Sequence, residues 1–109
     1  MNAIQFIQQH GFERAREELT KLPNSNVTHM TDDARMFVDE NNPLLDEFQR
    51  SQIKDLICIN DLKRLVKSID TVNSFGGLED SKAVVKMGKY YKYLKKAIAD
   101  YEAIGGEHV

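Results

Sequence analysis

The order of apolar and polar positions over residues 1–22 follows the period of an α-helix, with one interruption. Asn2 and Gln5 stand three apart, which is the spacing of the capping box that begins many helices. Gly11 breaks the pattern and ends this first helix. Apolar residues then recur at spacings of three, four and three, at Phe12, Ala15, Leu19 and Leu22. Because the pattern stops before Pro23, residues 1–22 are predicted to form an N-terminal helix pair.

Residues 23–59 have a weaker pattern and begin with the turn-rich stretch PNSNVTHMTDD. Residues 36–38 fit either a short strand or a turn of helix. Residues 56–59 are apolar throughout, and we expect them to be buried in either conformation. Asn42 followed by Pro43 is typical of a helix N-terminus, and predicts a helix with the apolar side Leu44, Leu45, Phe48 and Ile53.

Residues 60–74 carry a clear helical stripe. Asn60 is placed to cap a helix whose apolar positions are Leu62, Leu65, Val66, Ile69 and Val72. Gly76 and Gly77 follow Phe75, and two consecutive glycines supply the positive φ angles that a helix end and a tight reversal need. The helix is therefore predicted to end here and the chain to turn back.

A long final helix is predicted from about Leu78 to Ile104, so that residues 60–104 form an αα-hairpin. Its apolar seam has the alternating spacing of three and four that meets another helix, at Val84, Met87, Tyr91, Leu94, Ile98 and Tyr101. The seam could pack on the chain's own preceding helices or on a partner helix, as in a homodimer, and the spacing fits both. Residues 105–109 are expected to be a frayed tail.

These patterns together predict a mainly α fold, with one small domain of four or five helices over residues 1–109. The middle, residues 23–59, leaves room for a short β-hairpin or an extended segment. The predicted core consists of Ile4, Ile7, Phe12, Leu19, Leu62, Leu65, Val66, Ile69, Val72, Leu94 and Ile98.

The composition is that of an ordinary globular domain, with 41% hydrophobic and 29% charged residues among 109. The formal net charge is -2, which is not the whole-chain signature of a nucleic-acid-binding protein. Cys58 is the one cysteine and lies in an apolar run, so we expect a buried thiol. The N-terminus lacks the features of a leader and no window is apolar enough for a membrane span, which favours the cytoplasm and no membrane partner.

Charge is nevertheless unevenly distributed along the chain. Six acidic residues against two arginines give residues 24–50 a net charge of -4. The predicted final helix instead carries six lysines with no acidic residue between Ser81 and Ala99, at Lys82, Lys86, Lys89, Lys92, Lys95 and Lys96. Such lysines fit a solvated helix face, a surface for an acidic protein (including the chain's own middle), or contacts to nucleic-acid phosphates. Candidate partner-binding residues on the same helix are Met87, Tyr90, Tyr91, Tyr93 and Tyr101.

Catalytic chemistry is poorly represented in the sequence. The three histidines are far apart and none has a second His or Cys at helical spacing, so neither a metal nor another cofactor is expected. Gly76 and Gly77 lack the lysine and hydroxyl of a phosphate-binding loop. A helix-turn-helix aligned on Gly11 or on Gly76 places a charged residue in its core. We therefore expect a protein that is not an enzyme.

Three stretches carry a resemblance to a known family: MNAIQFIQQHGFERAREEL, INDLKRLVKSIDTVNSFGGLEDSK and LKKAIADYEAIGG. They resemble small accessory proteins encoded in the early regions of lambdoid phages and enterobacterial prophages, a family without assigned biochemistry. The resemblance covers about the first 20 and the last 50 residues, and residues 24–57 have no counterpart in it. It implies an accessory protein of the bacterial cytoplasm that binds a host or phage protein, with no catalytic motif to carry over. The alternative is a non-specific nucleic-acid-binding protein, whose affinity would fall steeply with salt.

Overall fold

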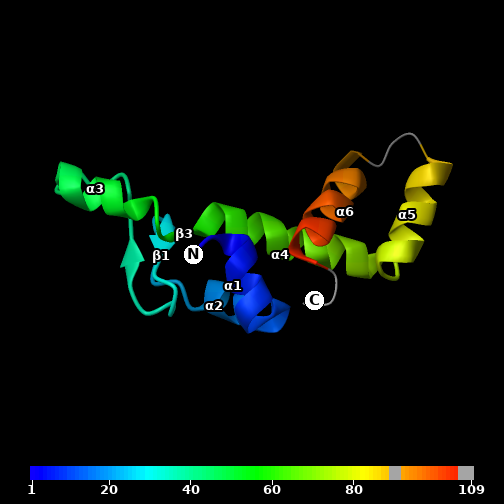
Figure 1. Cartoon of the computed structure of the whole chain (residues 1–109), viewed down its shortest axis with the longest axis horizontal. Coiled ribbons are helices and arrows are strands. Elements are labelled where there is room, and N and C mark those ends of the chain that lie inside the picture. Colours follow the sequence, from blue (N-terminus) through cyan, green and yellow to red (C-terminus); the bar gives the residue numbers. More distant parts are fainter. Residues whose placement is uncertain (89–91, 106–109) are drawn as a thin grey trace.

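The computed structural model describes residues 1–88 and 92–105, and this part of the chain is mostly helical with one small antiparallel sheet (Figure 1). The helices are α1 (Ala3–His10), α2 (Phe12–Thr20), α3 (Glu47–Ile53), α4 (Ile59–Ser74), α5 (Leu78–Met87) and α6 (Lys92–Ile104). The strands are β1 (His29–Met30), β2 (Phe37–Val38) and β3 (Ile57–Cys58). The molecule measures 51 × 26 × 21 Å, and its radius of gyration of 15.8 Å exceeds the value of about 13 Å expected for a compact domain of this length. It is therefore elongated.

The N-terminal helix pair is confirmed. The side chain of Asn2 accepts a hydrogen bond from the amide of Gln5 at 2.8 Å, and the side chain of Gln5 accepts one from the amide of Asn2 at 2.9 Å. These two bonds form the predicted capping box. Gly11 has a φ of +87° and donates its amide to the carbonyl of Ile7 at 2.7 Å, so α1 ends and α2 begins around this one residue.

The middle of the chain contains the small sheet, in which β1 lies between β2 and β3 and pairs antiparallel with both. Residues 36–38 therefore contribute a strand rather than a turn of helix. Met30 and Ile57 are fully buried where the sheet meets the helices. Cys58 is only partly buried, contrary to our expectation, because it lies at the junction where the strand gives way to α4.

The predicted helix start at Asn42 is wrong. Its side-chain oxygen accepts the amide of Leu44 at 3.0 Å, which closes a turn rather than a helix. Helix α3 begins four residues after Pro43, where Asp46 and Gln49 form a capping box. Of the predicted apolar side, Ile53 is buried, whereas Leu44 and Phe48 have 88% and 69% of their surface exposed.

Helix α4 is the spine of the fold, and its five predicted stripe positions are all buried. It begins before Asn60, which therefore does not cap it. The reason is that the amide of Ile59 donates to the carbonyl of Thr28 at 2.9 Å, so the last hydrogen bond of the sheet leads directly into the first turn of the helix. Helices α1, α2 and α6 all pack against α4.

The reversal after α4 is confirmed, with φ angles of +96° at Gly76 and +110° at Gly77. The amide of Gly77 donates to the carbonyl of Val72 at 3.1 Å and closes the helix end. The hydroxyl of Ser81, which is fully buried, donates to the same carbonyl at 3.1 Å. This short turn therefore fixes the direction in which α5 leaves α4.

The prediction of a single helix from Leu78 to Ile104 is wrong. Helix α5 ends at Met87, Gly88 is extended with φ -138° and ψ 141°, and α6 begins at Lys92. Glycine is a poor helix former, and the break lets α6 return over α4 and bury its own apolar residues there. These are Leu94, Ala97, Tyr101 and Ile104.

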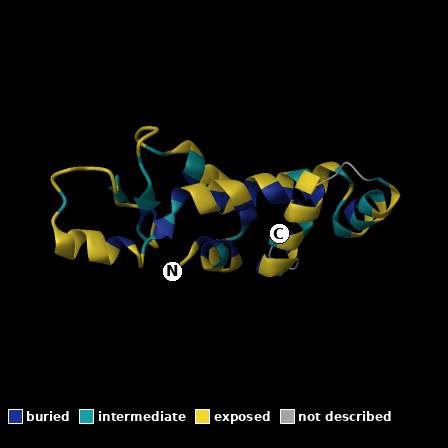
Figure 2. Cartoon of the chain, turned by 90° about the horizontal axis from the view of Figure 1, so that it is seen from above, coloured by how far each residue is buried: buried dark blue, intermediate teal, exposed yellow. Residues whose placement is uncertain are grey.

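Most of the predicted core is confirmed. The buried members are Ile7, Phe12, Leu62, Leu65, Val66, Ile69, Val72 and Leu94. Ile4, Leu19 and Ile98 are partly buried and pack against this core. In Figure 2 the buried positions gather along α4 and the helices that contact it, whereas α3 at one end of the molecule is largely exposed.

Candidate functional site

The break after Met87 brings α5 and α6 together at one end of the molecule, where a shallow groove of about 290 Å³ lies between them. Figure 1 shows α5 beyond the end of α4 and α6 lying across α4. The groove is lined by Lys82, Val85, Lys86, Lys95 and Ile98. We call it the α5–α6 groove.

The α5–α6 groove combines an apolar floor with a basic rim. Val85 and Ile98 are partly buried and form the floor. At the rim, the ammonium of Lys82 lies 3.0 Å from a carboxylate oxygen of Glu102, so this charge is partly compensated. Within the described residues, neither Lys86 nor Lys95 has an ion-pair partner, and both are exposed. Two cations are therefore available beside an apolar surface.

The six candidate lysines do not share one continuous helix face, because the helix is divided. Lys82 and Lys86 lie on α5, Lys92 and Lys95 lie on α6 with Lys96, and three of the six line the groove. Lys92 and Lys96 are exposed on α6 outside the groove. Lys89 lies outside the described residues.

The candidate aromatic and methionine contacts are dispersed in the same way. Met87 ends α5 with 88% of its surface exposed, and Tyr93 on α6 is 58% exposed. Tyr101 is buried in the core with 9% exposed, so its ring packs inside the chain rather than on the surface. Tyr90 and Tyr91 lie outside the described residues. The predicted seam is therefore split, with its α6 part packed on the chain's own helices.

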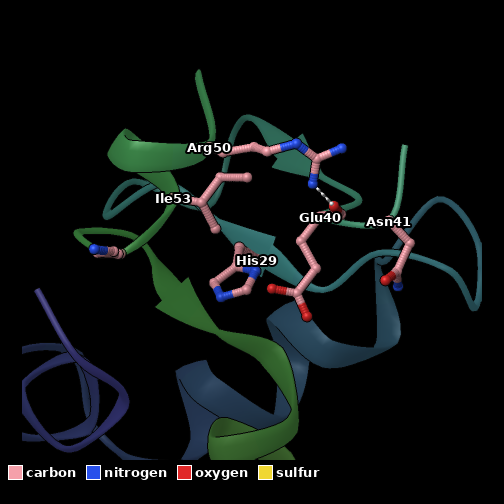
Figure 3. A pocket seen from close by; sticks show the side chains of 6 residues that line it. His29, Glu40, Asn41, Arg50 and Ile53 are labelled. Carbon is pink, nitrogen blue, oxygen red and sulfur yellow. Dashed lines mark hydrogen bonds between the residues drawn. The ribbon is translucent and has the colours of Figure 1, made fainter. Parts of the chain in front are cut away.

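A second hollow, of about 390 Å³, lies at the opposite end of the molecule and was not anticipated from the sequence. It is lined by His29, Glu40, Asn41, Arg50, Ile53 and Lys54, which come from β1, α3 and the segments next to them (Figure 3). These residues are up to 25 positions apart in the sequence and are brought together by the sheet, so no local spacing signals the hollow.

The arginine of this second hollow has a structural task. One guanidinium nitrogen of Arg50 donates to the carbonyl of Glu40 at 2.9 Å and the other donates to the carbonyl of Asn42 at 3.0 Å. Figure 3 shows the first of these bonds, with the Glu40 side chain extending toward His29. Arg50 therefore holds the loop before α3 against the helix, and two of its five N–H donors are used in these bonds.

The same end of the molecule carries a segment rich in acidic residues. We call residues 39–56 the arm; it contains α3 and the loops on either side. Leu44 and Phe48 are exposed on it, with Asp46 and Glu47 between them in the sequence. The arm thus has two exposed apolar side chains and a net negative charge.

A shallow hollow beside the arm is also acidic, with Asp32, Asp33 and Asp55 among its lining residues. The Thr31 hydroxyl and the backbone N–H of Arg35 both donate to the Asp33 carboxylate and lower the pKa of that group. Asp33 therefore stays ionised at neutral pH. Within residues 1–88 and 92–105, no three His, Cys, Asp or Glu side chains are grouped so that they could hold a metal ion.

Comparison of the chain with protein-family models, with curated proteins and with solved structures gives no match. Among the helices in the described part of the chain, none combines the length and the apolar character needed to cross a bilayer.

Proposed function

We propose that this chain is a non-enzymatic accessory protein, of phage or prophage origin, that binds an acidic amphipathic segment of another protein in the α5–α6 groove. The observation that carries the proposal is the apolar floor of Val85 and Ile98 beside the uncompensated cations of Lys86 and Lys95. The sequence resemblance supports the same class, since it implies an accessory protein of the bacterial cytoplasm that binds a host or phage protein.

The lining of the α5–α6 groove, apolar and basic side by side, suits a helical ligand. An amphipathic helix places its apolar anchors in a hydrophobic groove and keeps charged side chains at the edges. Here the anchor would contact Val85 and Ile98, while carboxylates of the ligand would lie within reach of Lys86 and Lys95. Charge at the rim would mainly raise the association rate and select acidic ligands, and the apolar contact would supply most of the affinity.

A protein ligand suits this groove better than a nucleic acid. Phosphate contacts need cations along a backbone and gain nothing from an apolar floor. One rim lysine, Lys82, is already paired with Glu102. The acidic arm at the far end of the chain would also repel a long polyanion. Nucleic-acid binding is therefore the alternative outcome of the test rather than the proposal.

The test is affinity capture from enterobacterial lysate, with and without nuclease, using the whole chain as bait. Wild type is compared with Lys86→Glu/Lys95→Glu, which reverses the two free charges of the groove. The matched control is Lys63→Glu/Lys67→Glu, which makes the same charge change at exposed positions of α4. Circular dichroism establishes that all three proteins are folded.

We expect a protein that survives nuclease treatment, is reduced about tenfold or more by the groove variant, and is retained by the control variant. The proposal is wrong if the groove variant captures the same proteins as wild type, or if wild type captures none. Recovery of nucleic acid alone, lost in the groove variant and retained by the control variant, would favour the alternative function.

A further inference from the structure

The acidic arm and the α5–α6 groove lie at opposite ends of the long axis of the molecule (Figure 1). We propose that the segment bound in the groove is the arm of a second copy of this chain, so that molecules associate head to tail. This inference rests on the proposed function, because it uses the same groove, and it names the ligand.

The arm has the chemistry that the groove requires. Phe48 and Leu44 expose 69% and 88% of their surface, although residues of this kind are usually buried. Acidic residues lie near them in the sequence, at Asp39, Glu40, Asp46 and Glu47. The arm also contains Arg50 and Lys54, so its five acidic residues leave it a net charge of -3. Two exposed apolar side chains on this negatively charged segment are therefore complementary to an apolar floor rimmed by lysines on another molecule.

The arm is also held in one shape before it meets a partner. Asp46 and Gln49 form reciprocal hydrogen bonds of 2.7 and 3.1 Å that cap α3. Arg50 holds the preceding loop through the carbonyls of Glu40 and Asn42. A segment that is ordered in advance loses less conformational entropy on binding, which favours association.

The contact has to be made between molecules. The long axis measures 51 Å, and α4 lies between the arm and the groove (Figure 1), so an arm cannot reach the groove of its own chain. The two surfaces are different, so each contact leaves one arm and one groove unoccupied. Association of this kind continues into chains of molecules unless the rotation closes a ring.

The size of the ends sets the expected strength. The two shorter extents, 26 and 21 Å, give each end a projected area of about 550 Å². Both partners together then bury about 1,100 Å², which is at the low end for specific interfaces. We therefore expect weak association that depends on protein concentration and is reduced by salt, because part of the attraction is between charges.

The test is sedimentation velocity of the purified full chain over a wide concentration range. The groove variant is Lys86→Glu/Lys95→Glu, and the arm variant is Leu44→Ser/Phe48→Ser, which alters two exposed side chains. We expect the sedimentation coefficient of wild type to rise with concentration. Each variant alone should associate at least tenfold more weakly, and Lys63→Glu/Lys67→Glu should behave as wild type.

Mixing the two variants gives the sharpest result. The groove variant keeps its arm and the arm variant keeps its groove, so one contact remains possible between them. We expect the mixture to form a 1:1 dimer that grows no further. A wild type that stays monomeric at all concentrations, or a mixture that forms no dimer, overturns the head-to-tail proposal. So does an arm variant that dissociates while the groove variant still associates, since that result indicates arm-to-arm contact.

The two proposals fail separately. If wild type is monomeric but the groove variant still loses its partner from the lysate, the head-to-tail proposal is wrong. The groove then remains a site for another protein. A wild type that associates through the groove but captures no other protein would contradict the binding of a host or phage protein and leave self-association as the use of the groove.

Discussion

Gly77 sets the direction of α5 and therefore the position of the groove. Its φ of 110° and ψ of -174° lie in a region that residues with a Cβ atom rarely adopt. We predict that Gly77→Ala destabilises the fold by about 1–3 kcal/mol, because no rotamer change can relieve backbone strain. Urea denaturation monitored by circular dichroism measures the difference.

Asn73→Ala is the control for Gly77→Ala, because Asn73 is exposed on the last turn of α4 and has ordinary helical geometry. It should change the free energy of unfolding by less than about 0.5 kcal/mol. Equal stability of wild type and Gly77→Ala would mean that the turn is not fixed as described.

At single residues, the sequence was informative where one local interaction had no competitor. Asn2 and Gln5 form the predicted capping box, and Gly76 and Gly77 adopt the predicted positive φ angles after Phe75. Asn42 could cap a helix or close a turn, and its bond to the amide of Leu44 decided for the turn. The true helix start, Asp46 with Gln49, has the same spacing of three as the N-terminal box and was a readable signal.

At the scale of elements, the packing of α6 on α4 holds the groove in place. Leu94 is fully buried in α6, and α4 makes its most extensive contact with α6. The hydroxyl of Ser68 on α4 also donates to the carboxylate of Asp100 on α6 at 2.7 Å. Apolar burial and this partly buried hydrogen bond therefore both stabilise the packing of α6 on α4.

We predict that Leu94→Ala destabilises the protein by about 2–5 kcal/mol, the cost of a cavity where a large side chain was buried. Lys96→Ala, an exposed change on the same helix, should cost less than about 0.5 kcal/mol. Thermal and urea denaturation of both variants would measure this. A small effect of Leu94→Ala would show that α6 is not anchored on α4 by this residue.

The division between α5 and α6 could not be read from apolar spacing. The spacing of three and four continues through Gly88, so the seam predicted one helix. Glycine lowers helix stability by about 1 kcal/mol, which is too little to end a helix without help. What decides is the burial gained when α6 turns back over α4, and this gain depends on contacts distant in the sequence.

At the scale of the whole molecule, burial is concentrated in the middle. Helix α4 buries seven of its residues, whereas α3 buries Ile53 and α5 buries Ser81. The sequence predicted the buried positions of α4 well, because the apolar stripe of this helix is regular and does not depend on how the two ends of the molecule fold. It misplaced Leu44 and Phe48, because an apolar residue on a surface has the same sequence pattern as one in a core. Those two exposed residues are the ones to which the head-to-tail contact assigns a partner.

This gradient of burial predicts a gradient of local stability. Amides in α4 should be the most protected from hydrogen exchange, because they open only with the core, and amides in α3 and α5 should exchange faster by about tenfold or more. Hydrogen exchange followed by mass spectrometry at low protein concentration measures this difference. At high concentration, protection should rise at α3 and α5 and stay constant in α4, because head-to-tail contact covers the two ends. Equal protection along the chain would contradict the gradient of stability. If protection of α3 and α5 is the same at low and high protein concentration, the ends of the molecule do not form the proposed contact.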